Sequence, residues 1–303
     1  MVCFSVVIPL FNKKEKISIA LDSINFQTVQ DFEVVIVDDG SRDGSKEIVK
    51  QWILTNAVEK NKYRLVTQSN EGVSSARNLG VKESKFDYIA FLDADDYWKK
   101  DHLYSLKLLI EEFSGKVDMF STGVMQFQDG QEVFPALKGY ENFIGVVDFF
   151  KVSMISNGFI NSSSVCVKKK VIQCVSFPVG MVNYEDVITW ARISGSIGFA
   201  FCSNRSAVYV IDNADASLNV EFDSFINFNE LLDLVDCDDK LIYKIKFFGL
   251  HLLFCKMNMS FKEYFRAGRY ITGFNIVILI FVAALFVPKF VLKGLRNKRK
   301  KVK

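Results

Sequence analysis

The first hundred residues alternate between short apolar runs and longer segments suited to helices. The runs are too short for helices and are bounded by polar residues, which is typical of buried parallel strands. They lie at residues 4–9, 32–37, 63–68 and 88–92. The helical segments lie at residues 14–25, 45–59 and 72–81, the first with Ile17, Ala20, Leu21 and Ile24 on one face. This alternation predicts βαβ units and a parallel sheet with helices on both faces.

After Trp98 this rhythm changes, and the pattern predicts mixed strands with fewer helices. We expect helices at residues 101–113 and 185–194, and strands at residues 117–126, 131–135 and 208–211. A segment rich in Ser and Asn, residues 158–167, leads into another strand. The second half would then supply the other side of a cleft.

From about residue 221 the chain becomes helical and apolar, and Tyr270–Val287 has no charged residue. Its length as a helix, about 27 Å, barely matches a bilayer core of about 30 Å. Basic residues precede it, and six Lys or Arg stand within residues 296–303. Positive charge on both sides favours an interfacial or re-entrant helix on anionic lipid, although a single span is possible. The alternative is a buried core helix with a disordered tail.

Composition narrows the class of protein. A chain of 303 residues that is 50% hydrophobic, with 29 Phe, suggests one large or two modest domains and contact with a membrane. Six Cys without C-x-x-C pairs and only two His argue against a zinc site or a disulfide scaffold, and favour a reducing cytosol. No basic residues precede the apolar segment 2–10, so we read it as the first strand rather than a signal peptide.

Three carboxylates, Asp93, Asp95 and Asp96, follow the apolar run at residues 88–92. In open α/β sheets the ligand binds beyond the carboxyl ends of the strands. Two carboxylates spaced i, i+2 there can hold a hard divalent cation, which in turn can hold a diphosphate. The alternative is an acidic loop that caps the next helix. No G-x-G-x-x-G follows the first strand and no G-K-[ST] is present, which argues against dinucleotide and P-loop sites.

Motifs at the ends of the other expected strands support the functional interpretation. They are Val6–Asn12, Val35–Ser41 and Asn70–Asn78, and a later acidic pair lies within Asn183–Arg192. In order, spacing and identity these motifs resemble the family 2 glycosyltransferases, inverting nucleotide-sugar transferases of the GT-A group. The resemblance covers about residues 4–215 and implies an α/β, Rossmann-like mixed sheet flanked by helices. We assign residues 1–100 to the nucleotide-sugar half, 101–220 to the acceptor and base half, and 221–303 to a helical membrane-associating region.

The resemblance assigns the nucleotide to the first three motifs. Pro9, Phe11 and Asn12 would meet the base, with the Phe11 ring available for stacking. Asp39 would accept from a uracil nitrogen or a ribose hydroxyl; its alternative is a plain turn or helix cap. Arg77 would approach the base or the phosphates, and its alternative is a surface ion pair on a helix.

The family's D-x-D motif falls on Asp93 and Asp95. Asp95 would be the direct ligand of Mg²⁺ or Mn²⁺, and Asp93 would bind ribose, or the metal through water. For Asp96 we expect no more than a helix cap.

The Glu-Asp motif of the family falls on Glu185 and Asp186, with Asp186 as general base. It would deprotonate an acceptor hydroxyl as that oxygen attacks the anomeric carbon opposite the diphosphate, which inverts the linkage. Glu185 and Arg192 would serve the acceptor, Glu185 by orienting the sugar or Arg192. The alternative is that adjacent acids favour a helix start. The chain departs from the family at residues 209–217, where acids replace the expected basic loop over the diphosphate; Arg205 is a weak substitute.

The resemblance therefore implies an inverting glycosyltransferase of bacterial O-antigen, capsule or exopolysaccharide assembly. Its donor would be a nucleotide-sugar, most commonly a UDP-sugar, and its acceptor a saccharide linked to a polyprenyl diphosphate. We expect membrane lipid but no nucleic acid as a partner, at the cytoplasmic face of the inner membrane. The rivals are a transferase acting on protein or a soluble acceptor, and a non-catalytic nucleotide-sugar-binding assembly protein.

Overall fold

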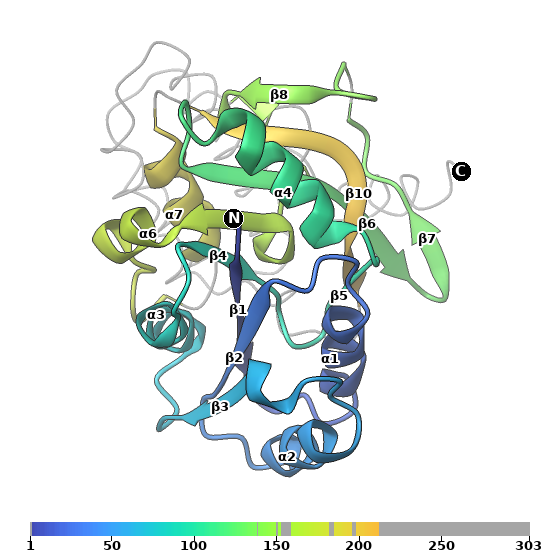
Figure 1. Ribbon diagram of the computed structural model, residues 1–303, viewed down its shortest axis with the longest axis vertical. Coiled ribbons are helices and arrows are strands. Elements are labelled where there is room, and N and C mark those ends of the chain that lie inside the picture. Colours follow the sequence, from blue (N-terminus) through green and yellow to red (C-terminus); the bar gives the residue numbers. More distant parts are fainter. Residues whose placement is uncertain are drawn as a thin grey trace, which may run out of the picture. The chain divides into compact units, whose positions relative to one another are not determined.

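The computed structural model of the protein describes residues 2–137, 139–149, 151–152, 159–181, 185–195 and 198–211 (Figure 1). They belong to a compact unit that spans Met1–Asp215. The expected helical region at residues 221–303 lies outside the described residues, as do Asn183 and the loop at residues 212–217. None of the helices in the described ranges is long and apolar enough to cross a membrane.

The first half alternates strand and helix, as its sequence pattern predicts. Its strands are β1 (Phe4–Leu10), β2 (Phe32–Asp38), β3 (Tyr63–Thr67) and β4 (Tyr88–Phe91). Its helices are α1 (Ile17–Asn25), α2 (Ser45–Thr55), the short 3₁₀ turn η1 (Lys60–Lys62) and α3 (Val73–Glu83). The helix expected over residues 45–59 ends early, because the chain passes through η1 before it enters β3.

The second half contains shorter and more irregular elements. Its strands are β5 (Tyr97–Trp98), β6 (Met119–Gln128), β7 (Gln131–Val133), β8 (Ile144–Val147), β9 (Val165–Lys168) and β10 (Phe199–Ile211). Its helices are α4 (His102–Phe113), the 3₁₀ turn η2 (Ser162–Ser164), α6 (Lys169–Val175) and α7 (Glu185–Ser194). The sequence predicted α4, β6, β7 and α7 but not β5, β8 or α6.

Strand β10 is much longer than the expected strand at residues 208–211. Polar residues Ser203–Ser206 interrupt its apolar pattern, so the sequence did not predict the first half of the strand. In the structure β10 crosses this stretch with register shifts against β6 between Cys202 and Arg205 and between Arg205 and Ala207. Such a bulge lets a strand continue where its side-chain alternation is broken.

The described strands form one mixed sheet in the order β3-β2-β1-β4-β9-β6-β10-β5 (Figure 1). Strands β2, β1 and β4 are parallel neighbours, and β3 is parallel to β2. Strand β9 is antiparallel to both β4 and β6, whereas β10 runs parallel to β6. The expected parallel first half is confirmed, and its strands deliver their carboxyl ends to one edge of the sheet.

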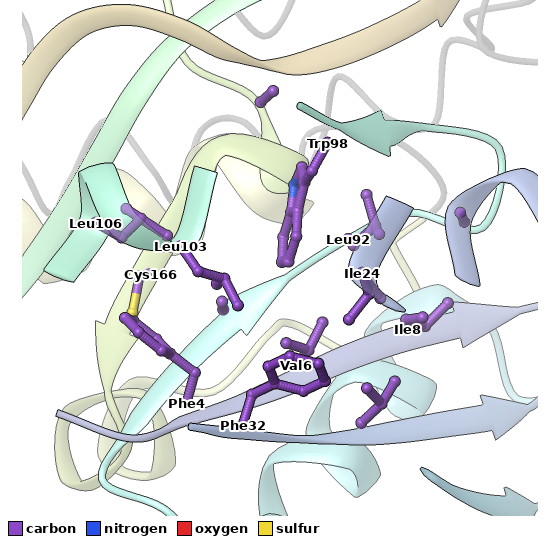
Figure 2. Packing of buried hydrophobic residues seen from close by; sticks show 14 of the residues in the cluster. Phe4, Val6, Ile8, Ile24, Phe32, Leu92, Trp98, Leu103, Leu106 and Cys166 are labelled. Atoms are coloured by element: carbon purple, nitrogen blue, oxygen red, sulfur yellow. The ribbon is translucent and has the colours of Figure 1, made fainter. Parts of the chain in front are cut away.

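Helices cover both faces of this sheet. Figure 2 shows one face, where Phe4, Val6 and Ile8 of β1 pack among residues from α1 and α4. Those residues include Ile24, Leu103 and Leu106. On the other face, Val35 and Val37 of β2 pack against Ala76 of α3. Because neighbouring residues of a strand point to opposite faces, an apolar run such as β1 serves both layers.

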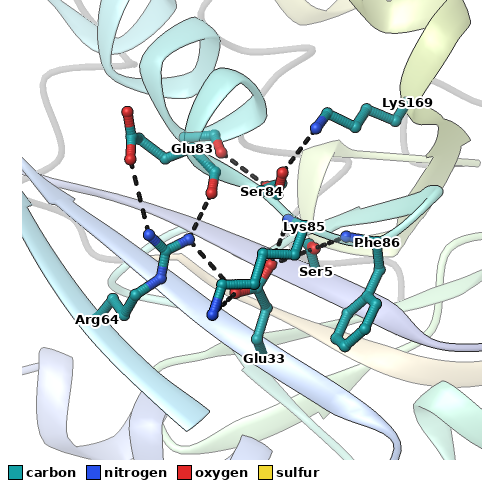
Figure 3. Close-up of polar contacts among 9 residues, drawn as sticks. Ser5, Glu33, Arg64, Glu83, Ser84, Lys85, Phe86 and Lys169 are labelled. Atoms are coloured by element: carbon teal, nitrogen blue, oxygen red, sulfur yellow. Dashed lines mark hydrogen bonds and ion pairs between the residues drawn. The ribbon is translucent and has the colours of Figure 1, made fainter. Parts of the chain in front are cut away.

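A polar network ties the end of α3 to the amino ends of three strands (Figure 3). The buried Glu33 carboxylate accepts from Ser5 Oγ at 2.7 Å and from Arg64 Nη2 at 3.3 Å. It also accepts from the Lys85 backbone N–H, and Arg64 donates to the Glu83 carbonyl. The network fixes the end of α3 against the sheet, at the edge opposite the predicted ligand site.

Candidate active site

The acidic loop that follows β4 carries two partly exposed carboxylates. Asp93 has 29% of its side chain exposed and Asp95 has 19%. The Asp95 carboxylate forms an ion pair with the ammonium of Lys13, which follows β1. Lys13 was not among the predicted site residues. The only local signal was a basic residue directly after Asn12, at the carboxyl end of the first strand.

Arg77 joins the acidic loop to α7. Its Nη2 donates to Asp93 Oδ1 at 2.8 Å and its Nη1 donates to Glu185 Oε1 at 2.7 Å. The guanidinium carbon lies 5.3 Å from the centre of the Phe177 ring. Arg77 is only 3% exposed, so the alternative of a surface ion pair is wrong. The contact with base or phosphate stays a prediction.

Asp186 lies in the first turn of α7, next to Glu185. Its Oδ2 accepts from Ser162 Oγ at 3.2 Å, and its Oδ1 accepts from the Val187 backbone N–H at 2.7 Å. The structure thus gathers the D-x-D carboxylates and the Glu-Asp pair around Arg77, although 92 residues separate Asp93 from Glu185 by their numbers. The predicted catalytic and metal-binding residues share one site.

The electrostatics of this cluster follow from burial and like charges. Burial raises the pKa of Asp93 above its usual value, as do the charges of Asp95 and Asp186, while Arg77 opposes the shift. Burial and the Asp186 charge likewise raise the pKa of Glu185, again against Arg77. Burial disfavours the Arg77 charge, yet the surrounding carboxylates raise the pKa of Arg77, so it stays protonated. The cluster holds four acidic side chains, Asp93, Asp95, Glu185 and Asp186, against the two cations of Arg77 and Lys13.

Asp96 does not cap a helix, contrary to our expectation. Helix α4 begins at His102, after Asp101. Asp96 is instead 1% exposed and accepts from Ser163 Oγ at 2.5 Å and from the Val210 backbone N–H at 3.0 Å. Burial raises the pKa of Asp96 well above its usual value, and the charges of Asp93 and Asp95 add to this effect. Asp96 anchors the acidic loop to β10.

Asp39 holds the loop that precedes α3. Its Oδ1 accepts from Gln68 Nε2 and from the Glu71 backbone N–H, both at 2.8 Å. Its Oδ2 accepts from the Gly72 backbone N–H at 2.9 Å. Asp39 is 2% exposed, and its hydrogen bonds join the end of β2 to the start of α3. This is close to the turn-and-cap alternative, and contact with a nucleoside stays a prediction.

The first motif lies at the same edge of the sheet. Pro9 pairs with Val37 within the strands, and the Phe11 side chain is 41% exposed. Asn12 adopts a positive φ of 51°, donates its N–H to Ser41 Oγ at 3.1 Å and accepts from the Arg42 backbone at 2.8 Å. The two loops are thus locked together, with the Phe11 ring available for stacking on a flat base.

Two predicted basic residues lie apart from the central cluster. Arg192 stands about two turns along α7 from Glu185, which pairs with Arg77. Within the described ranges, Arg192 Nε is buried without a hydrogen-bond partner. Arg205 donates to the Pro135 carbonyl at 2.7 Å and stacks over the Phe134 ring. Their roles toward acceptor and diphosphate stay predictions.

The η2 turn contributes three buried serines that the sequence did not single out. Ser162 contacts Asp186, as above, while Ser163 contacts both Asp96 and the Asp93 backbone N–H. Ser164 closes the turn on Asn161. The Ser-rich composition of residues 158–167 was the only signal, and it indicated no particular contact.

The carboxylates of the acidic loop fit a divalent cation whose other ligands come mainly from a substrate. In the described part of the chain, no three His, Cys, Asp or Glu side chains are grouped so that they could hold a metal ion by themselves. Mg²⁺, however, binds through one or two carboxylates together with substrate phosphates. Asp95 and Asp93 supply such carboxylates, and the surplus negative charge around them favours a cation over a neutral ligand. Lys13 balances part of that charge at Asp95.

Comparison with known proteins assigns this chain to a family. The family model for glycosyl transferase family 2 matches residues 5–159. The chain is 31% identical over 211 residues to the amylovoran biosynthesis glycosyltransferase AmsB of Erwinia amylovora, covering 66% of each protein. It is 27% identical over 188 residues to the glycosyltransferase GlyA of Streptococcus pneumoniae, covering 60% of this chain. The matches thus span just under two thirds of AmsB and 26% of GlyA.

Solved structures share the fold. Staphylococcus aureus TarS 1–349 in complex with UDP-GlcNAc gives a TM-score of 0.66 at 17% identity, covering 94% of this chain and 80% of that one. The mannosyltransferase PcManGT of Pyrobaculum calidifontis, in complex with GDP-Man and Mn²⁺, gives 0.55 at 16% identity, covering 98% and 87%. The predicted GT-A-like mixed α/β fold is confirmed.

Proposed function

The chain belongs to glycosyl transferase family 2 and is a glycosyltransferase, and from this premise we propose its donor, acceptor and mechanism. It transfers one sugar, with inversion, from a UDP-sugar to a saccharide carried on a polyprenyl diphosphate. It does so in the assembly of a bacterial surface polysaccharide. The relative AmsB, named for amylovoran biosynthesis, supports the pathway class, and the UDP-GlcNAc in TarS supports a uridine donor.

One observation carries the proposal: Arg77 brings the D-x-D loop and the Glu-Asp pair of α7 into one cluster. A transferase must hold a donor diphosphate and an acceptor base side by side. The acidic loop lies at the carboxyl edge of the sheet, where α/β folds bind nucleotides. Asp186 stands beside it with one carboxylate oxygen on a serine hydroxyl and the other on a backbone N–H. Neither of these partners is a cation, so neither forms an ion pair with the Asp186 carboxylate.

Asp186 acts as the general base of the proposed reaction. Its carboxylate takes the proton from the acceptor hydroxyl while that oxygen forms the new bond to the anomeric carbon. The bond from the anomeric carbon to the diphosphate oxygen breaks, and the electron pair leaves with the nucleoside diphosphate. Attack and departure occur on opposite faces, so an α-linked donor yields a β-linked product.

Asp95 would hold Mg²⁺ or Mn²⁺ directly, and Asp93 would bind the ribose, or the metal through water. When bound, the cation neutralises negative charge on the departing diphosphate. Arg77 keeps Asp93 and Glu185 oriented toward the site, and the Phe11 ring and the loops around Asp39 receive the nucleoside. Glu185 and Arg192 serve the acceptor side of the cleft.

We place the enzyme at the cytoplasmic face of the inner membrane. A lipid-linked acceptor requires access to that surface, and the apolar Tyr270–Val287 segment with its basic flanks supports an interfacial or re-entrant anchor. A transferase on protein or soluble acceptors would use the same anchor without the lipid acceptor.

The decisive experiment measures nucleotide release from UDP-, GDP- and dTDP-sugars, with and without Mn²⁺, for the wild type, Asp95→Ala and Asp186→Asn. A polyprenyl-linked saccharide extract serves as acceptor. We expect Mn²⁺-dependent release from a UDP-sugar and about a 100-fold loss in Asp186→Asn, within the range for a general base. Release from a GDP-sugar alone would overturn the donor assignment. Nucleotide binding without turnover, with the extract present, would instead support the non-catalytic assembly protein.

A further inference from the structure

From the geometry of the η2 turn, we propose that Ser162 is a positioning residue that orients the Asp186 carboxylate toward the acceptor. This inference rests on the proposed function, because it assigns a partner to the proposed base. Ser162 is 2% exposed, and its Oγ donates to Asp186 Oδ2 at 3.2 Å. It therefore acts on the reaction through Asp186.

The turn that presents Ser162 is anchored to the donor side of the site. Ser163, the next residue, donates to Asp96 Oδ2 and accepts the Asp93 backbone N–H at 3.1 Å. The Trp98 indole N–H donates to the Ser163 carbonyl at 2.6 Å. Successive residues of one short turn thus contact the D-x-D loop and the base.

The turn is also closed upon itself. The Ser164 N–H donates to the Asn161 carbonyl at 3.0 Å, and Ser164 Oγ accepts the Asn161 N–H at 3.1 Å. Ser164 Oγ further lies 3.1 Å from Ser121 Oγ on β6. A buried turn whose serine hydroxyls are hydrogen-bonded in this way keeps the Ser162 hydroxyl in one place.

Asp186 needs such a partner because, among the described residues of α7, one backbone N–H holds one of its oxygens. Oδ1 accepts the Val187 N–H, and without Ser162 the carboxylate could rotate about its remaining contact. A general base must lie within hydrogen-bond reach of the proton it takes, so a small rotation costs rate rather than binding. The hydroxyl sets the distance and angle of the base relative to the acceptor hydroxyl.

The test compares Ser162→Ala, Ser162→Thr and Asp186→Asn for UDP release from the UDP-sugar that the wild type turns over. We expect Ser162→Ala to lower kcat about tenfold, the equivalent of about 1.4 kcal/mol for one hydrogen bond, with KM for the donor unchanged. Ser162→Thr, which keeps the hydroxyl, should restore most of the rate. A fall in donor affinity with kcat unchanged, or no rescue by Thr, would overturn the inference.

Ser164→Ala is the matched control, because Ser164 belongs to the same turn but does not contact Asp186. We expect it to lower the melting temperature while kcat stays within about threefold of the wild type. A loss of kcat equal to that of Ser162→Ala would assign the effect to the turn and not to the hydroxyl. If Asp186→Asn kept the wild-type rate, the proposed base itself would be wrong. If Asp186→Asn lost activity and Ser162→Ala did not, only this inference would fail.

Discussion

Arg77 and Glu185 form a buried ion pair of 2.7 Å across 108 positions of the sequence. Arg77 lies on α3, which the first half of the chain holds against the sheet, and Glu185 opens α7 in the second half. With the second bond to Asp93, the guanidinium connects the proposed donor side and acceptor side of the site. The pair therefore joins the two halves of the proposed site through one buried side chain.

Arg77→Met should destabilise the fold strongly. The change leaves Glu185 and Asp93 without their cation in a buried setting, where loss of one partner costs about 3–5 kcal/mol. Urea denaturation followed by circular dichroism measures the loss. Glu59→Gln, which removes the half-exposed Glu59 carboxylate from its pair with Lys62, is the control and should cost less than about 1 kcal/mol. Equal losses in the two variants would show that the Arg77 cluster is more solvated than its burial indicates.

Lys13→Met should strengthen Mn²⁺ binding in the absence of nucleotide. The Lys13 ammonium pairs with Asp95, so it repels a cation that approaches this carboxylate and competes for it. We expect about a tenfold tighter Kd, equivalent to about 1.4 kcal/mol, measured by electron paramagnetic resonance of free Mn²⁺. Lys14→Met is the neighbouring control and should leave the Kd unchanged, while Asp95→Ala should abolish binding. An unchanged Kd in Lys13→Met would remove Asp95 as the direct ligand.

Much of the fold could be predicted because the local hydrophobic pattern of its first half marks each strand and helix. Short apolar runs and helical segments alternate there, and each motif directly follows a strand. Parallel strands bring their carboxyl ends to one edge, so Asp39 and Asp93 could be assigned to that edge from order alone. The family resemblance then extended the prediction to Asp186, on a helix whose bounds agree with those expected.

The contacts within the site could not be predicted in the same way. The bonds of Lys13 to Asp95, Ser162 to Asp186 and Arg77 to Glu185 join segments 24 to 108 positions apart. No periodicity encodes such pairs, since they depend on how loops and helix ends from distant parts of the sequence meet in the fold. Asp96 illustrates the error: local spacing suggested a cap, but its partners come from η2 and β10.

Gly80→Ala should destabilise the protein because α3 packs closely on β1. A Cβ at Gly80 would lie 2.3 Å from Val7 Cγ1 and 3.4 Å from Val37 Cγ2, both within the sheet. Overpacking of this kind costs about 1–3 kcal/mol, measurable by urea denaturation. Gly115→Ala is the control, because its Cβ would meet no heavy atom within 4 Å, and it should stay within about 0.5 kcal/mol of the wild type. Similar losses in both variants would contradict the close approach of α3 to β1.

His102 should make the fold sensitive to acid. The ring is fully buried, stacks 4.2 Å from Trp98, and has Nδ1 3.0 Å from Ser206 Oγ. Burial lowers the pKa of His102 from 6.5 to about 3. Between these two pH values His102 is protonated in the unfolded chain but neutral in the folded protein. Its contribution to stability is thus complete above pH 6.5 and is lost as the pH falls toward 3, by up to about 1.4 kcal/mol per pH unit. His102→Phe keeps the stacked ring but cannot be protonated. From pH 7 to pH 5 the unfolding free energy of the wild type should therefore fall relative to that of the variant. A difference that stays constant over this range, in urea titrations at each pH, would mean that the folded protein protonates His102 as readily as the unfolded chain does.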